Sequence, residues 1–354
     1  MHTSETTEDI YQLVVNARDV EKEIEKNGAK NLSADATKVN GTHELKILSK
    51  LSEREVDYCE PLYPRPFSID ANAFRASAPN GRLSVHLVKP IVACTLQALQ
   101  RLHSRNIIHA DIKASNFLFF DLGPPQIERI IARDPPSYSD VYVFNGNEYP
   151  TLETQPLQSV LSWVASAFDA ETIQVVLSGL GTALCSDSDE PNLSGNIGTF
   201  ALRAPEVIIR AQCGKEIDIW AIGCMTYELL TGQTLFRPLA IPSLTPNESL
   251  LLLQLAVTGE TLSKDVIGQS CVRDKFFDRE GFLIHSKENI YLPQSIKARL
   301  TELCKDTKIQ INAAAKFIND CLRLNPHDRP TVDRLALHPW LSTAFRGGVD
   351  NEDF

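Results

Sequence analysis

The sequence lacks any arrangement of cysteines or histidines that would indicate a metal site. Its eight cysteines are scattered between residues 59 and 321, no two of them enclose only two residues, and the histidines are not clustered. Structural zinc sites use closely spaced cysteine and histidine ligands, and disulfide frameworks belong to small, cysteine-dense secreted domains. The pattern therefore predicts neither kind of site and is typical of a reducing compartment.

Long apolar stretches are also missing. The longest aliphatic run, Leu250–Leu253, is far shorter than a membrane-spanning helix, which needs about 20 apolar residues. The first ten residues, MHTSETTEDI, have neither the basic nor the apolar region of a signal peptide. We therefore expect no contact with a membrane and an intracellular location, whether cytoplasmic, nuclear or both.

Basic residues are fewer than acidic residues. The chain has 35 basic and 45 acidic residues and a formal net charge of −10. Such a balance disfavours nonspecific attraction to nucleic acids and anionic membranes, and it favours a basic protein partner. Apolar residues make up 43% and charged residues 23% of the 354 residues, an ordinary globular composition long enough for about two domains.

One segment is dense in reactive side chains. Residues 107–120 read IIHADIKASNFLFF, in which two apolar runs flank a polar loop with His109, Asp111, Lys113 and Asn116 at short intervals. A carboxylate can abstract a hydroxyl proton, an ammonium can neutralise a transferring phosphoryl group, and a carboxamide can ligate magnesium. The segment resembles the catalytic loop of protein kinases, whose pattern is H-x-D-x-K-x-x-N.

This resemblance implies a role for each polar residue of the loop. Asp111 would be the catalytic base, and Lys113 would be an electrostatic clamp on the γ-phosphate. Asn116 would bind a magnesium ion and so contribute to the nucleotide site, whereas His109 would be structural.

Further motifs follow in the order found in kinases: RAPEV at 203–207, DIWAIG at 218–223 and HDRP at 327–330. The resemblance implies that Thr199 braces the catalytic loop and that Asp218 accepts hydrogen bonds from the loop backbone. Glu206 would form a buried bidentate ion pair with Arg329. The apolar segment 216–232 is expected to form a central buried helix that stops at Gly232.

Two insertions resemble those of fungal SR-protein kinases, serine/threonine kinases of the CMGC group. Asn116 and Gly179 are separated by far more residues than a hairpin turn needs, which indicates a spacer insert at about residues 123–171. Within it, residues 158–168 have a modestly helical pattern. The stretch KFFDREGFL at 275–283 is similar to the extra segment of these kinases.

The amino-terminal part resembles a kinase amino-terminal lobe less closely. Residues 11–15 favour a strand, and residues 28–36 resemble the strand that carries the ATP-binding lysine, which would be Lys30. Residues 43–51 resemble the regulatory helix, with Glu44 as the ion-pair partner of Lys30. From residue 84 a helical pattern begins, in which Pro90 predicts a kink or a later start.

Three expected parts of a kinase are missing from the sequence. No glycine precedes Gly28, so the chain has no glycine-rich loop to approach nucleotide phosphates. The sequence between residues 51 and 84 is too short for the usual hinge that binds adenine. Gly179 stands where the family has the aspartate that binds magnesium, and the neighbouring Ser178 is a poor replacement.

The sequence thus predicts an α+β, bilobal protein-kinase-like fold. A degenerate β-rich amino-terminal lobe would span residues 1–82, a largely complete helical lobe would span 83–345, and 346–354 would be an acidic tail. ATP and magnesium are expected cofactors if the chain is active, and no cofactor is expected if it is not.

Three functions remain open at this level. The first is a pseudokinase-like protein with impaired catalysis that acts by binding a protein partner. The second is an active ATP-dependent serine/threonine kinase whose amino-terminal lobe is incomplete in this chain. The third is a noncatalytic scaffold that binds basic Arg/Ser-rich partners. Its binding to them would weaken as the salt concentration rises.

Overall fold

A computed structural model describes most of the chain that follows residue 68. The described residues are 47, 50, 69–119, 128–129, 132–133, 138–144, 147–152, 161–186, 197–238, 243–284, 294–304 and 310–344. Lys30, Glu44, the predicted strand at 11–15 and the tail at 346–354 lie outside them. Of the predicted helix at 43–51, Ile47 and Lys50 are described and helical, and the Ile47 side chain is buried.

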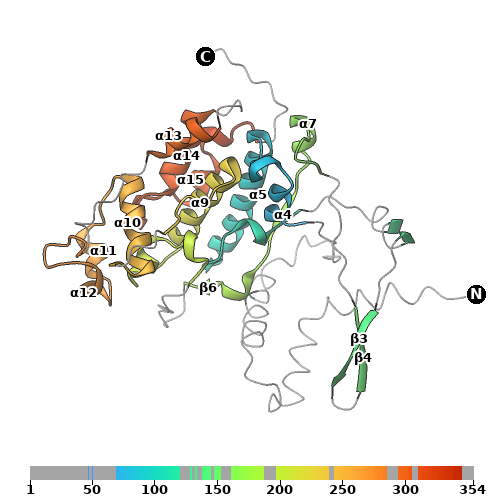
Figure 1. Cartoon of the computed structure of the whole chain (residues 1–354), viewed down its shortest axis with the longest axis horizontal. Coiled ribbons are helices and arrows are strands. Elements are labelled where there is room, and N and C mark those ends of the chain that lie inside the picture. The colour runs from blue at the N-terminus through green and yellow to red at the C-terminus, as the bar shows by residue number, and fades with distance from the viewer. Residues whose placement is uncertain are drawn as a thin grey trace, which may run out of the picture.

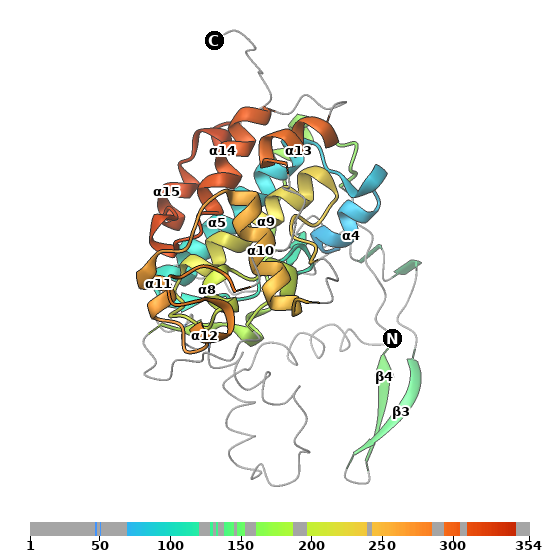
Figure 2. The same ribbon diagram turned by 60° about the vertical axis from the view of Figure 1, so that its left-hand side comes forward.

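A helical body surrounds helix α9, Glu216–Thr231 (Figures 1 and 2). Because α9 is apolar on almost every face, it is buried between α5, Val85–Ser104, and α14, Ile311–Cys321. The approach to α14 requires Gly223, where an added Cβ would lie 2.7 Å from the Cβ of Cys321. The central buried helix predicted from the sequence is confirmed.

Shorter helices cover this core. Several are capped by a hydroxyl residue at the N-terminus. Thr245 forms a capping box with Glu248 before α10, Pro246–Thr258, and Ser263 and Ser295 cap α11, Lys264–Gly268, and α13, Ile296–Leu303. The remaining α-helices are α4 Ala71–Ala76, α7 Ala167–Ala170, α8 Pro205–Ile208, α12 Arg273–Phe276 and α15 Val332–Ala336. The 3₁₀ turns are η1 Pro79–Gly81, η2 Ala114–Asn116, η3 Leu180–Thr182, η4 Phe200–Leu202, η5 Pro326–Asp328 and η6 Pro339–Leu341.

The strands of the described part form three antiparallel pairs. Strand β1, Ile107–Ile108, pairs with β6, Leu184–Cys185, and β2, Phe117–Phe119, pairs with β5, Val175–Leu177. A longer hairpin consists of β3, Tyr138–Phe144, and β4, Asn147–Leu152, and projects away from the helical body (Figure 1). The first two pairs hold the two ends of the polar loop at 109–116.

Two sequence predictions are corrected in this part of the chain. Of the two alternatives predicted for Pro90, a kink or a later start of the helix, the later start is wrong, because α5 starts at Val85. Pro90 removes one backbone donor, but it is buried with Leu87, Val88 and Ile91, and this burial outweighs the lost hydrogen bond. Residues 161–166 of the expected helix at 158–168 are not helical, and α7 begins only at Ala167. The β3–β4 hairpin was not predicted from the sequence.

Two glycines that end helices provide a matched test of backbone strain. Gly232 after α9 and Gly259 after α10 both have left-handed backbones, with φ of 71° and 67°. An added Cβ at Gly232 would overlap the carbonyl oxygen of Asn80, whereas a Cβ at Gly259 would meet nothing within 4 Å. We expect Gly259→Ala to lower the free energy of unfolding by about 1 kcal/mol and Gly232→Ala by about 2–3 kcal/mol. Urea unfolding of both variants measures this, and equal losses would contradict the role of Asn80.

Candidate active site

The polar loop is fixed at both ends by strands and by a buried carboxylate. Asp218, near the start of α9, is 1% exposed. It accepts hydrogen bonds from the backbone N–H of His109 at 2.9 Å and of Ala110 at 2.8 Å. These bonds hold Ala110 in a left-handed conformation, with φ of 67°. The contact between Asp218 and the loop that the sequence predicted is therefore present.

His103 is a further support that sequence reasoning missed. Its Nε2 donates to the Asp218 carboxylate at 2.9 Å, and the ring is buried. The sequence offers only a weak signal, a histidine in the last turn of a helix whose buried face is mostly apolar, a few residues before the loop. One carboxylate thus joins α5, α9 and the loop.

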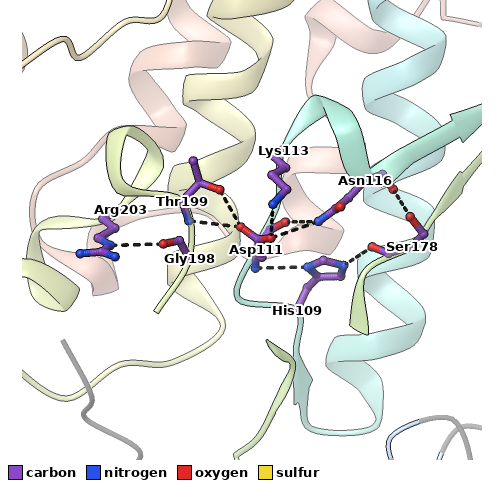
Figure 3. Close-up of polar contacts among 8 residues, drawn as sticks. All are labelled: His109, Asp111, Lys113, Asn116, Ser178, Gly198, Thr199 and Arg203. Atoms are coloured by element: carbon purple, nitrogen blue, oxygen red, sulfur yellow. Dashed lines mark hydrogen bonds and ion pairs between the residues drawn. The ribbon is translucent and has the colours of Figure 1, made fainter. Parts of the chain in front are cut away.

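Asp111 is surrounded by hydrogen-bond donors (Figure 3). Thr199 donates to it twice, from its hydroxyl at 2.8 Å and from its backbone N–H at 3.1 Å. Lys113 Nζ lies 2.6 Å from the other carboxylate oxygen, and Asn116 Nδ2 lies 3.3 Å from it. The structure thus brings together four of the residues that the sequence singled out.

The electrostatics of this cluster keep Asp111 ionised. Burial of the carboxyl group is the largest influence and raises its pKa. The hydrogen bonds from Lys113, Thr199 and Asn116, together with the charge of Lys113, outweigh burial and hold the pKa below its ordinary value. At neutral pH the group is therefore a carboxylate that can accept a proton.

A second set of hydrogen bonds links the loop to the segment after β5. Asn116 Nδ2 donates to the carbonyl oxygen of Asp111 at 2.8 Å, and the carbonyl oxygen of Asn116 accepts from both the N–H and the hydroxyl of Ser178. His109 Nε2 donates to the carbonyl oxygen of Ser178 at 2.9 Å (Figure 3). The His109 ring thus links the loop that follows β1 to the segment that follows β5, which is a structural role.

Gly179 follows directly and lies against Asn116. Its backbone is left-handed, with φ of 85°, and an added Cβ would lie 2.7–2.9 Å from the carboxamide atoms of Asn116. The side of Asn116 that faces this segment therefore meets a bare backbone and no carboxylate. In the part of the chain that the structure describes, no three His, Cys, Asp or Glu side chains are grouped as metal ligands.

The segment at 197–206 closes the other side of the loop. Gly198 has a φ of 70°, and an added Cβ would lie 2.7 Å from the carbonyl oxygen of Ala110. Arg203 donates from Nε to the carbonyl oxygen of Gly198 at 3.3 Å, and burial lowers the pKa of its guanidinium. The sequence analysis gave neither residue a role, although Gly198 directly precedes Thr199 and Arg203 begins the RAPEV motif.

The predicted ion pair of Glu206 and Arg329 is confirmed. Both side chains are fully buried, and the two guanidinium nitrogens donate to the two carboxylate oxygens at 2.6 and 2.8 Å. Arg329 also donates to the backbone carbonyls of Arg323 and Glu216 at 2.8 and 2.9 Å. Through Arg329, the pair connects α8, which contains Glu206, to the first residue of α9, Glu216.

Comparison with known proteins agrees with this arrangement. Residues 169–341 match the family model described as protein kinase domain. Over these residues, nearly half of its length, this chain is similar to protein kinase domains. A crystal structure of a kinase domain matches it with a TM-score of 0.56 and 19% sequence identity, over 85% of this chain and 83% of that chain. The match shows the fold and confirms the α+β kinase fold predicted from the sequence.

Curated proteins to which this chain is similar include several serine/threonine kinases. It is 30% identical to the kinase SKY1 of Saccharomyces cerevisiae over 169 residues, which are 48% of this chain and 22% of SKY1. It is 24% identical to the kinase SRPK of Physarum polycephalum over 272 residues, 72% of this chain and 61% of SRPK. The probable kinase dyrk2 of Dictyostelium discoideum is 27% identical over 270 residues, 73% of this chain and 22% of dyrk2. The chain spans less than two thirds of each of these relatives.

The kinase relatives are consistent with the subgroup indicated by the inserts, since two of them are SR-type and one is DYRK-type. No described helix is both long enough and apolar enough to cross a membrane. Lys30 and Glu44, the predicted nucleotide-binding pair, lie outside the described residues, so their roles stay predictions.

Proposed function

We propose that this chain is a protein of the SR-protein-kinase type in which phosphoryl transfer is impaired. The proposal depends on one observation, which is that Gly179 faces Asn116 where a magnesium-binding carboxylate is needed. Phosphoryl transfer depends largely on positioning and on neutralising charge, and magnesium supplies much of that charge. A site that offers the Asn116 carboxamide without a carboxylate beside it holds magnesium weakly.

The proton-transfer half of the site is intact. Asp111 would accept the proton of a substrate hydroxyl group, and Lys113 would neutralise a phosphoryl oxygen next to it. Thr199 and Asn116 would hold the Asp111 carboxylate in place. These roles are supported by the hydrogen bonds that surround Asp111 and by its lowered pKa.

The residues at the expected metal position do not suit a magnesium ion. Asn116 offers one carbonyl oxygen, and its Nδ2 already donates to Asp111. The nearby Ser178 hydroxyl donates to the backbone of Asn116. Magnesium takes charged oxygen ligands in near-octahedral geometry, and in the described part of the site Asp111 is the one carboxylate, already bonded to Lys113 and Thr199. We therefore derive no catalytic step through magnesium.

Restoring the carboxylate tests this proposal directly. Any side chain at position 179 must shift the Asn116 carboxamide, so the comparison is between two variants of equal size. We expect Gly179→Asp to bind ATP in the presence of magnesium about tenfold or more tightly than Gly179→Asn, because only aspartate adds a charged ligand beside Asn116. Gly179→Asn is the matched control, since asparagine also tolerates a left-handed backbone and has the same size without the charge. Calorimetry with and without magnesium measures the difference. Equal binding by both variants would contradict the role of position 179.

An active kinase is the second candidate, and the preformed cluster around Asp111 favours it. Its substrate would be a protein, for which the relatives and the acidic net charge favour basic Arg/Ser-rich segments. Incubating the full chain with radiolabelled ATP and an Arg/Ser peptide, next to Asp111→Asn, separates the candidates. If the unmodified chain transfers phosphate to the peptide and Asp111→Asn does not, the proposal that catalysis is impaired is wrong. Salt-sensitive peptide binding without transfer would support a binding protein.

A further inference from the structure

A glutamine lies on the buried face of α10. This face includes Leu250, Leu251, Gln254 and Val257, whose spacing places them on one side of the helix. Gln254 is 0% exposed, and burying a carboxamide costs free energy unless its polar atoms are hydrogen-bonded. Its Oε1 atom is buried without a hydrogen-bond partner among the described residues. An apolar residue would avoid this cost, so the presence of a carboxamide is explained by what its Nε2 binds.

The Nε2 of Gln254 donates to the backbone carbonyl oxygen of Arg203 at 2.8 Å. Arg203 ends the 3₁₀ turn η4, and Thr199 begins it. Within the turn, the N–H of Leu202 donates to the carbonyl oxygen of Thr199 at 2.9 Å, which fixes the two ends relative to each other. Thr199 in turn donates to Asp111 from its hydroxyl and its N–H. Turn η4 is therefore held by Gln254 at one end and by Asp111 at the other.

Polar contacts set the position of η4 more than packing does. A small cavity of about 20 Å³ lies between the turn and the catalytic loop, and Ala110, Asp111 and Thr199 are among the residues that line it. Packing across this boundary is therefore incomplete. Arg203 makes a second contact with the start of the turn, from its Nε to the carbonyl oxygen of Gly198 at 3.3 Å (Figure 3). A shift of Arg203 is thus transmitted to the residue that precedes Thr199.

We propose that Gln254 is a positioning residue that acts through η4 to hold Thr199 against Asp111. This inference deepens the proposed function, because it rests on Asp111 as the proton acceptor of that site. Without the Gln254 carboxamide, the Arg203 end of η4 loses one of its contacts. The donors of Thr199 then move away from their best geometry, and hydrogen bonds weaken steeply with distance and angle.

Replacing Gln254 with methionine tests this proposal, because methionine has a similar length and volume but no donor. In the full chain, the amide of Thr199 should exchange its hydrogen about tenfold faster, measured by hydrogen exchange. The pKa of Asp111 should rise, because hydrogen bonding from Thr199 is one of the causes that lower it. Carbon NMR of labelled aspartate measures this titration. If neither the Thr199 amide nor the Asp111 titration changes, the proposal is wrong.

Val257→Ala is the matched control for general destabilisation. Val257 is the next buried residue on the same face of α10, and its truncation leaves the hydrogen bond of Gln254 in place. This variant should change the exchange of the Thr199 amide only as far as it changes global stability, and the pKa of Asp111 should stay the same. Equal changes in both variants would show that Gln254 only supports the fold.

A double variant tests the route from Gln254 to Asp111. Thr199→Val removes one of the hydrogen bonds to the carboxylate and should itself raise the pKa of Asp111. Gln254→Met should then raise it less than in the unmodified chain, because both changes act through Thr199. An equal effect in both backgrounds would overturn the proposal. These measurements use no ATP, so their outcome is independent of whether phosphoryl transfer is impaired.

Discussion

Replacing Arg329 with methionine is expected to lower the free energy of unfolding by about 3–5 kcal/mol. The substitution leaves the Glu206 carboxylate fully buried without its partner, and the backbone carbonyls of Arg323, Glu216 and Leu324 each lose a hydrogen bond as well. The guanidinium also lies 5.1 Å from the ring of Trp220, so packing on α9 is lost too. Since domains of this kind are stable by roughly 5–15 kcal/mol, this is a large share of the total.

Urea unfolding followed by tryptophan fluorescence measures this loss. Lys316→Ala is the control, because it breaks an ion pair with Asp320 in which the side chains are 66% and 33% exposed. Exposed pairs contribute little, so the control should change stability by less than about 0.5 kcal/mol. A loss for Arg329→Met no larger than that of the control would show that the buried pair does not hold the fold together.

Replacing Asp218 with alanine is expected to cost about 4 kcal/mol and to loosen the catalytic loop. The change removes the acceptor for the N–H groups of His109 and Ala110 and for the His103 ring, and each buried donor left unsatisfied costs about 1–3 kcal/mol. Ala110 keeps its left-handed backbone only because these bonds hold it. We therefore expect the loop to relax away from Asp111.

Hydrogen exchange distinguishes this local effect from general destabilisation. The amides of His109 and Ala110 should exchange much faster in Asp218→Ala, whereas those in the middle of α9 should change only as far as global stability does. Asp333→Ala is the control, since it removes an exposed hydrogen bond from Gln100. Unchanged protection of the two loop amides would contradict the anchoring role of Asp218.

Much of the site could be predicted because its chemistry is local in sequence. Asp111, Lys113 and Asn116 occur within six residues, and the distances among their side chains follow from one short loop between two strands. Thr199, Asp218 and the Glu206–Arg329 pair are distant in sequence. They were predictable only because the family resemblance supplied their partners.

Other features were out of reach for sequence reasoning. The helical pattern from residue 84 was visible, but whether Pro90 would delay the start of α5 depends on how well Pro90 and its neighbours are buried, which is a property of the assembled core. The β3–β4 hairpin arises in a segment whose periodicity is weak. His103 is indistinguishable in sequence from any histidine near a helix end until Asp218 is placed beside it.

By itself, the sequence determined the elements and the chemistry of this protein: a buried helix at 216–231, its stop at Gly232, a loop with a carboxylate, an ammonium and a carboxamide, and the absence of a carboxylate at 179. Only the tertiary structure decided that Gly179 lies against Asn116 and that one carboxylate anchors both α5 and the loop. The physical reason is that these contacts join residues far apart in the chain, and their distances are set by the packing of helices and strands, which no local pattern specifies.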